Sequence, residues 1–312
     1  MKSRVKGSLI LLLTAMIWGT AFVTQKSGVQ YVGPFTLNTI RSFLGAFVLL
    51  PLVRFGRTEA EKEGRGPDRK TVLLGGVLCG ITIFAGLTLQ QVGIMYTTAG
   101  KAGFLTTIYV ILVPLLGLFI GKKVRPLMWL CVFLTLTGLY LLSAKPGTFI
   151  IGKGDLLVIL SAVGFSFQML AADYYTKRMN SILLSSMQLF VCGILSLPLM
   201  IIFEDPSISA VMACAPQLLY MGILSSGFAY TLQIVGQQYA EPTVASLILS
   251  LESLFAALSG ALFLGEAMTG REITGCALML AAVMMSQFPA AQGTAEKKEF
   301  NETEDPASED AG

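Results

Sequence analysis

The sequence predicts an all-α polytopic membrane protein whose ten transmembrane helices form two inverted five-helix repeats. Three observations lead to this fold class: apolar composition, an internal repeat and an uneven distribution of basic residues. The 312 residues are 54% hydrophobic and 13% charged, whereas an ordinary soluble domain is about 25% charged. Apolar runs of about 20 residues, the length that crosses a bilayer, recur along the whole chain.

A repeated nonapeptide is the strongest sign of duplication. Thr88–Tyr96 reads TLQQVGIMY and Thr231–Tyr239 reads TLQIVGQQY, so six of nine positions are identical at an offset of 143 residues. Leu118–Gly121 and Leu262–Gly265 repeat in the same way at an offset of 144. We therefore expect two copies of one structural unit.

The N-terminal segment belongs to this repeat. Residues 1–22 resemble a signal peptide, with three basic residues ahead of an apolar core. However, residues 7–15 are mirrored by residues 154–162, at an offset of 147. The segment is therefore interpreted as the first membrane span.

Each unit holds five apolar segments, several of which begin at a proline, where the missing N–H costs little. We expect a first repeat over 1–145, a second over 146–289, and a disordered acidic cytoplasmic tail over 290–312. The predicted spans are 8–26, 34–54, 71–92, 98–120, 126–143, 155–176, 181–203, 215–236, 243–264 and 272–289.

Basic residues predict the orientation. With the N-terminus inside, cytoplasmic segments hold 16 Lys and Arg residues and outer segments hold four. The positive-inside rule then places both termini in the cytoplasm, as expected for a multi-pass protein of the cell inner (plasma) membrane. Because each unit has an odd number of spans, the second lies upside down relative to the first, an arrangement typical of secondary transporters.

The composition argues against catalysis and metal binding. The chain has no histidine, and its five cysteines show no CxxC spacing. Neither an HExxH motif nor a phosphate-binding glycine loop is present. We therefore expect no catalytic residues, no metal and no cofactor.

Several segments resemble a known family. The first span contains Leu13–Phe22 (LTAMIWGTAF), the second contains Arg41, and the ninth ends in Leu262–Glu266 (LFLGE). Over residues 5–288 the chain resembles EamA-type ten-helix carriers of the drug/metabolite transporter superfamily. The resemblance implies an exporter of small metabolites, often amino acids or related compounds, driven by ion or substrate gradients.

The chain departs from the family pattern at two places. Gly121-Lys122 stands where the family often has Gly-Glu, and Glu252-Ser253 stands where it commonly has Glu-Pro. The second departure argues against a proline-induced break in the ninth span.

Charged side chains at membrane depth are costly, by about 2.5–3.5 kcal/mol each, and are therefore functional candidates. Glu252 lies near the centre of the ninth span and is the candidate for ion coupling; the alternative is a structural ion pair with Arg41 or Lys101. Arg41 is interpreted as a structural intramembrane charge. Lys101 is a cavity candidate, or a side chain that reaches the outer surface. Asp173 is interpreted as a solvated interfacial anchor.

Uncharged polar side chains complete the candidate substrate cavity. Gln90 and Gln233 occupy equivalent positions of the repeat, and Gln168 lies deeper in the sixth span. Amides bind a zwitterion without a buried charge, although bonding between neighbouring helices is the alternative. Trp18 lies in mid-span; it either lines the cavity or packs against a neighbouring helix.

The sequence thus predicts a secondary membrane transporter that exports small organic metabolites by alternating access. The alternatives are a passive facilitator or channel for small solutes and a membrane-embedded enzyme acting on a lipid-linked substrate. The expected partners are a small-molecule substrate and the lipid bilayer, with no nucleic acid, in a monomer or homodimer.

Overall fold

The computed structural model describes residues 2–55, 66–143, 151–264 and 268–288, which form helices and turns without a β-strand. The expected acidic tail, Glu266 and the junction between the two expected repeats lie outside these residues. In chain order the helices are α1 (Lys2–Gly28), α2 (Pro34–Phe55), α4 (Arg69–Tyr96), α5 (Ala99–Thr106), α6 (Tyr109–Phe119), α7 (Pro126–Ser143), α8 (Lys153–Tyr175), α9 (Ser181–Phe203), α10 (Ile208–Ala213), α11 (Ala215–Leu219), η1 (Tyr220–Phe228), α12 (Ala229–Gln237), α13 (Pro242–Leu249), α14 (Glu252–Leu264) and α15 (Gly270–Ser286).

Eight helical stretches in the described part of the chain are long and apolar enough to cross a membrane. The fourth of them joins α5 to α6, and the eighth contains α13 and the first part of α14. α7 contributes a shorter apolar helix, Pro126–Leu142. The tenth predicted span corresponds to α15, which has 17 residues. The all-helical fold class and the multiple apolar helices are confirmed.

Polar side chains define where several helices begin. Asn180 Oδ1 accepts hydrogen bonds from the backbone N–H groups of Ile182 and Leu183, at 2.9 and 3.2 Å, at the start of α9. The start of α2 is capped from a distant part of the chain, because Glu204 Oε2 accepts from the backbone N–H of Thr36 at 2.7 Å. Such caps satisfy N–H groups that a helix leaves free in its first turn.

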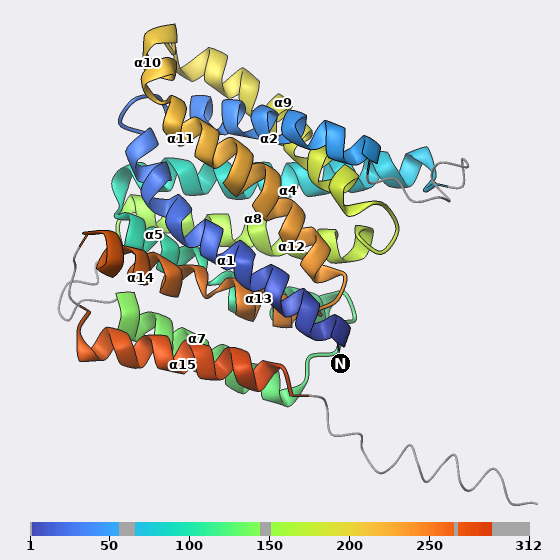
Figure 1. The fold of residues 1–312 in the computed structure, drawn as a ribbon, viewed down its shortest axis with the longest axis vertical. Helices are drawn as coiled ribbons and strands as arrows, with labels where there is room; N and C mark the ends of the chain where they lie inside the picture. The colour runs from blue at the N-terminus through green and yellow to red at the C-terminus, as the bar shows by residue number, and fades with distance from the viewer. Residues whose placement is uncertain (1, 56–65, 144–150, 265–267, 289–312) are drawn as a thin grey trace, which may run out of the picture.

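The most extensive helix contacts join the first 143 residues to the residues after 151. They pair α4 with α8, α2 with α9, α7 with α15 and α1 with α12. Figure 1 shows α7 and α15 side by side along one edge of the molecule. Small residues allow this approach: a Cβ atom added to Gly138 would lie 2.6 Å from the carbonyl oxygen of Gly275.

Two matching contacts occur where α1 and α8 begin. Lys6 Nζ lies 5.4 Å from the ring centroid of Tyr239, after the end of α12. Lys153 Nζ lies 5.1 Å from the ring centroid of Tyr96, at the end of α4. The two lysines are 147 residues apart and the two tyrosines 143, the offsets of the sequence repeat. The first turns of α1 and α8 therefore contact tyrosines at positions that the sequence repeat relates.

The start of α8 lies at the end of the molecule where α1 finishes. Near the end of α1, Lys26 Nζ donates to the carbonyl oxygens of Ile94 and Thr97, at 2.7 and 2.8 Å. Thr97 Oγ1 in turn donates to Asp155 Oδ1 of α8 at 2.6 Å. The end of α1, the end of α4 and the start of α8 thus meet.

The predicted fourth and ninth spans are interrupted at equivalent points. Ile108 N donates to Leu105 O at 3.3 Å between α5 and α6, and Leu251 N donates to Ile248 O at 3.1 Å between α13 and α14. These are tighter i→i−3 bonds of a 3₁₀ turn, again 143 residues apart.

The interruption between α13 and α14 occurs without a proline at position 253. Ser250 Oγ donates to the carbonyl oxygen of Leu247 at 2.6 Å, and Thr107 Oγ1 donates to that of Gly103 at 2.7 Å. Hydroxyls that bond back to the preceding turn bend helices. Hydroxyl side chains therefore occur at both breaks, and neither break needs a proline.

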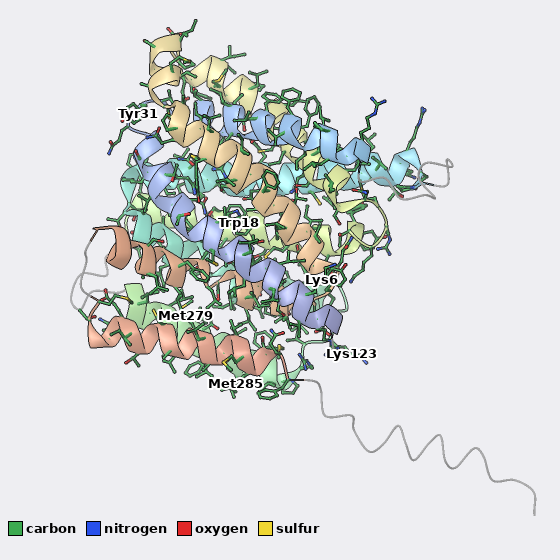
Figure 2. The ribbon with its side chains drawn as sticks, in the orientation of Figure 1. Lys6, Trp18, Tyr31, Lys123, Met279 and Met285 are labelled. Carbon is green, nitrogen blue, oxygen red and sulfur yellow. The ribbon has the colours of Figure 1, made fainter. Side chains whose placement is uncertain are left out.

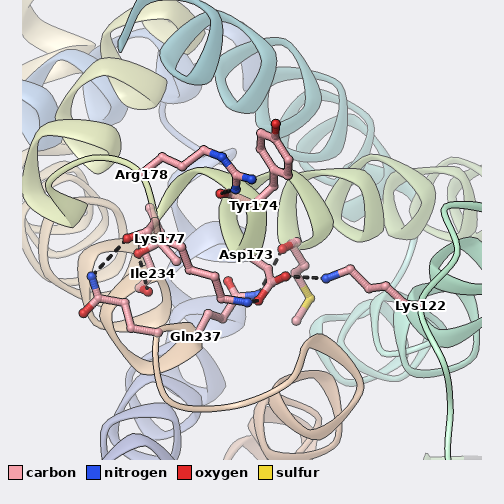
Figure 3. Close-up of polar contacts among 10 residues, drawn as sticks. Lys122, Asp173, Tyr174, Lys177, Arg178, Ile234 and Gln237 are labelled. Atoms are coloured by element: carbon pink, nitrogen blue, oxygen red, sulfur yellow. Dashed lines mark hydrogen bonds and ion pairs between the residues drawn. The ribbon is translucent and has the colours of Figure 1, made fainter. Parts of the chain in front are cut away.

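Asp173 was expected to be a solvated anchor, and this expectation is wrong. Figure 3 shows its carboxylate between the amines of Lys122 and Lys177. The Asp173 side chain is 2% exposed, and its Oδ1 lies 2.9 Å from Lys177 Nζ. Lys122 reaches it from the turn after α6, so the aspartate joins two distant segments at the end of α8.

Candidate solute cavity

A cavity of about 40 Å³ is lined by helices from both parts of the chain. Five of the six cavity candidates from the sequence line it, namely Trp18, Gln90, Gln168, Gln233 and Glu252, and so does Arg41, which was interpreted as a structural charge. Figure 2 shows Trp18 midway along α1. The remaining lining residues are Ala21, Phe22, Gln25, Thr106, Tyr109, Phe165, Met169, Ser225 and Tyr230.

Glu252 is the first residue of α14, so the interruption after α13 brings its carboxylate to the cavity. Its side chain is buried, and Tyr109 Oη donates a hydrogen bond to Glu252 Oε1 at 3.1 Å. A second bond joins the two interruptions, because the hydroxyl oxygens of Thr107 and Ser253 lie 3.0 Å apart. Two side-chain hydrogen bonds therefore connect the two breaks directly.

Arg41 supplies a positive charge to the same cavity. It is only 2% exposed. Its Nε donates to Ser226 Oγ at 3.1 Å and its Nη1 to Gln25 Oε1 at 3.5 Å. Within the described residues no ion pair joins Arg41 to Glu252. The guanidinium and the Glu252 carboxyl group therefore border one cavity, each with neutral hydrogen-bond partners.

The amide side chains form two groups around the cavity. Gln90 Nε2 donates to Thr106 Oγ1 at 2.9 Å. Gln233 Nε2 donates to Gln168 Oε1, and Gln168 Nε2 donates to Gln188 Oε1, both at 3.0 Å. Gln233 Oε1 is buried and has no hydrogen-bond partner among the described residues. The amides thus form the hydrogen bonds between helices that were stated as the alternative to solute binding. Gln233 Oε1 takes no part in these bonds and is left without a partner in the described residues.

Trp18 is fixed by an unusual helical segment. Its Nε1 donates to the carbonyl oxygen of Ser225 at 3.1 Å, and Ser225 lies in the π-helix η1. Its ring centroid lies 4.8 Å from that of Tyr230. Wider π turns leave carbonyl groups available to side chains and are frequent at functional sites. The indole thus lines the cavity and also makes a helix contact.

Lys101 lies outside the cavity lining. Its Nζ is 2.5 Å from Asp155 Oδ2, where the start of α5 meets the start of α8. An ion pair of Lys101 with Glu252 is therefore absent from the contacts between these described residues. The lysine therefore belongs to the group of contacts at the end of α1 that also contains Lys26, Thr97 and Asp155.

Tyr109, Ser225, Gln25 and Tyr230 line the cavity but were not selected from the sequence. A signal for Tyr109 was present, because adding the offset of 143 to its number gives Glu252. Residues 2–55, 66–143, 151–264 and 268–288 contain no group of three or more Cys, Asp or Glu side chains suited to holding a metal ion.

Comparison with known proteins identifies the family. The profile described as the EamA-like transporter family matches the chain twice, over residues 5–144 and 152–288. An uncharacterized transporter of Archaeoglobus fulgidus is 33% identical over 287 residues, which cover 90% of this chain and 86% of that protein. The uncharacterized transporter YoaV of Bacillus subtilis is 24% identical over 91% of this chain and 97% of its own length.

Two further similarities extend the comparison. A chloroplastic WAT1-related protein of Arabidopsis thaliana is 24% identical over 90% of this chain and 69% of its own length. A solved crystal structure shares the fold, with a TM-score of 0.73 and 18% identity over 91% of this chain and 96% of that one. Together with the apolar helices, these relatives indicate a multi-pass membrane transporter rather than an enzyme. The chain belongs to the EamA-like transporter family, within the drug/metabolite transporter superfamily.

Proposed function

We propose that this protein is a secondary carrier that exports small organic metabolites, amino acids or related compounds, by alternating access between two inverted repeats. The observation that carries the proposal is the cavity itself. The Arg41 guanidinium and the Glu252 carboxyl group both line it, and among the described residues no ion pair joins them.

These two groups complement a zwitterion. A guanidinium binds a carboxylate through parallel hydrogen bonds, and a buried carboxylate binds an ammonium group. The free oxygen of Gln233 adds an acceptor without a net charge. Phe165 and Met169 supply apolar surface, as expected for a pocket that orients a ligand with few polar groups.

The arrangement of helix ends supports two inverted units. Lys6 with Tyr239 and Lys153 with Tyr96 form equivalent contacts. The second contact lies where α1 ends and the first where α1 begins, so equivalent contacts occupy opposite ends of α1. The proposed units are residues 1–145 and 146–289, and the two family matches fall within them.

The size of the cavity supports a conformational step. A volume of about 40 Å³ holds roughly three water molecules, at about 10–15 Å³ for each. An amino acid needs more room, so the cavity must enlarge. We propose that the short turns at Thr107 and Ser250, with their i→i−3 bonds, act as the hinges of this step.

We further propose that the protein lies in the cell inner membrane with both termini in the cytoplasm. The 16-to-4 distribution of basic residues supports this orientation. Export then carries solute toward the end of the molecule where α1 finishes.

The test is solute uptake into everted membrane vesicles, across a panel of amino acids and dipeptides, with and without an imposed proton gradient. We expect accumulation of at least one solute that collapses when the gradient is removed. Matched vesicles without the protein measure background uptake. Equilibration without accumulation would identify a passive facilitator and contradict the carrier proposal.

A further inference from the structure

The interface between α2 and α9 contains buried polar residues outside the cavity chemistry described above. The two helices run antiparallel: the Thr36 backbone contacts Glu204, and Ser42 Oγ donates to Cys192 Sγ at 3.4 Å. Asn38 lies one turn before Ser42 and Ser196 one turn after Cys192. In an antiparallel pair, one turn back along α2 and one turn forward along α9 lead toward the same end of the interface. Asn38 and Ser196 therefore share the layer next to the Ser42–Cys192 contact.

The side chains in this layer have unpartnered polar atoms. Asn38 is fully buried, and neither its Oδ1 nor its Nδ2 has a hydrogen-bond partner among the described residues. Ser196 Oγ and Gln91 Oε1 are also buried and find no hydrogen-bond partner in the described part of the chain. Gln91 Nε2 lies 3.5 Å from the carbonyl oxygen of Gln25. We call Gln25, Asn38, Gln91 and Ser196 the polar layer.

The polar layer adjoins the cavity. Gln25 and Arg41 both line the cavity and contact each other, and Arg41 is three residues from Asn38 on α2. Gln25, Asn38 and Ser196 lie toward the end of α1, the start of α2 and the end of α9, which meet on one side of the bundle. The layer thus lies between the cavity and the face where α1 ends.

Equivalent positions of the repeat have a different character. The counterparts of Gln25, Ser196 and Gln91 are Ala172, Leu49 and Ile234, each fully buried in an apolar cluster. The counterpart of Asn38 is Ser185, whose hydroxyl accepts a hydrogen bond from Thr231 at 2.9 Å. At these four positions the end where α1 finishes is therefore polar, with atoms on Asn38, Gln91 and Ser196 that are unpartnered in the described structure. Three of the four counterparts are apolar, and the fourth, Ser185, is hydrogen-bonded.

Buried polar atoms in folded proteins are almost always satisfied, by protein groups or by water. We propose that the polar layer is a water-filled passage that connects the cavity to the membrane face at which α1 ends. Its amide and hydroxyl groups carry water and polar solute groups between the two. The passage is a property of this end of the molecule and does not depend on which solute is carried.

Thiol labelling tests the passage without any transport assay. Asn38→Cys and Ser196→Cys are exposed to a membrane-impermeant methanethiosulfonate in right-side-out and everted vesicles, and each modified peptide is quantified by mass spectrometry. Tyr31→Cys, in the exposed turn after α1, marks the face at which α1 ends. Ser185→Cys is the matched control, because it occupies the equivalent buried position of the other copy.

We expect Asn38→Cys and Ser196→Cys to react from the Tyr31→Cys face more than about tenfold faster than Ser185→Cys, because a dry site opens only by local unfolding. Rates equal to that of Ser185→Cys, or faster reaction from the opposite face, overturn the passage. The carrier proposal stands or falls separately, on the uptake assay.

Asn38→Leu decides the question if the cysteine variants do not fold. In a dry layer this nearly isosteric change removes two unpartnered polar atoms and raises the melting temperature. In a hydrated passage it displaces bonded water, so the melting temperature stays the same or falls. A clear rise overturns the proposal, and an unchanged or lower value supports it.

Discussion

Tyr109 and Glu252 are 143 residues apart, the offset of the repeated nonapeptide, and are hydrogen-bonded to each other from Oη to Oε1 at 3.1 Å. The offset of the sequence repeat therefore relates two positions that carry different side chains and lie in contact, where the fourth and ninth predicted spans are interrupted. The bond joins the coupling candidate to the other copy of the unit.

Replacing Glu252 with Gln is expected to lower proton-dependent accumulation. The amide keeps the size of the side chain but cannot carry the charge that binds an ammonium group or a proton. Loss of a hydrogen bond to a charged group is worth about 1.5–3 kcal/mol, so accumulation should fall about tenfold or more. The measurement is uptake into everted vesicles, normalised to the amount of inserted protein. Glu241→Gln, at an exposed glutamate before α13, is the control; unchanged transport in Glu252→Gln would remove Glu252 from the mechanism.

Replacing Tyr109 with Phe tests whether the tyrosine acts through Glu252. We expect Tyr109→Phe to lower transport on its own and to add little in a Glu252→Gln background, because both changes remove the same contact. The measurement is a double-mutant cycle on the initial uptake rate. Tyr140→Phe, at an exposed tyrosine of α7, controls for loss of a phenol hydroxyl. Additive effects would show that the two residues act independently.

Arg41 is expected to discriminate solutes by their carboxylate. In the unmodified protein an amino acid should bind more tightly than the amine that lacks its carboxylate, and Arg41→Gln should remove most of that difference. A charge-assisted pair contributes about 1.5–3 kcal/mol, or roughly tenfold or more in dissociation constant. Arg41→Lys should restore only part of it, because an ammonium lacks the planar fork. Binding of both solutes to purified protein, measured by calorimetry, gives the ratio.

Equal weakening of both solutes in Arg41→Gln would instead assign the arginine a structural role. The melting temperature of each Arg41 variant separates a loss of binding from a loss of folding.

Gly138→Ala is expected to destabilise the protein without changing the cavity. The added methyl group would meet the Gly275 carbonyl at 2.6 Å, and overpacking of this kind costs about 1–3 kcal/mol. α7 and α15 do not line the cavity, so solute affinity should stay the same while the melting temperature falls. Gly270→Ala on α15, which meets nothing within 4 Å, is the matched control. Equal melting temperatures for the two variants would contradict the close contact.

The apolar spans and the repeat could be predicted from the sequence because they depend on composition and offset alone. The repeat also made Gln90 and Gln233 equivalent, and the structure places both at one cavity. The partners of charged side chains were less accessible. Lys101 was considered as an ion-pair partner of Glu252, but its amine pairs with Asp155 at the start of α8. Which helix ends meet depends on packing, which the sequence does not show.

Asp173 and the break near Glu252 show the same limit in different ways. From the sequence, the Asp173 carboxylate, close to Lys177 and Arg178 at a helix end, is expected to be solvated. Only the path of the turn after α6 brings Lys122 into contact with it. The missing proline argues against a proline-induced break in the ninth span, and the break that exists there lies instead at Ser250. The Ser250 hydroxyl bonds back to Leu247, as that of Thr107 does to Gly103. A rule that associates kinks with proline alone overlooks this chemistry.

The pairing of helices across the chain has a consequence for biosynthesis. α1, α2, α4 and α7 each bury a face against a helix that follows residue 151. At about 5–20 residues per second, their partners leave the ribosome roughly 7–30 s later. Until then the first five predicted spans lie in the bilayer with small-residue faces such as that of Gly138 uncovered, open to lipid or to a neighbouring nascent chain. Two separately translated halves should therefore rescue each other when they are made together, and neither should persist alone.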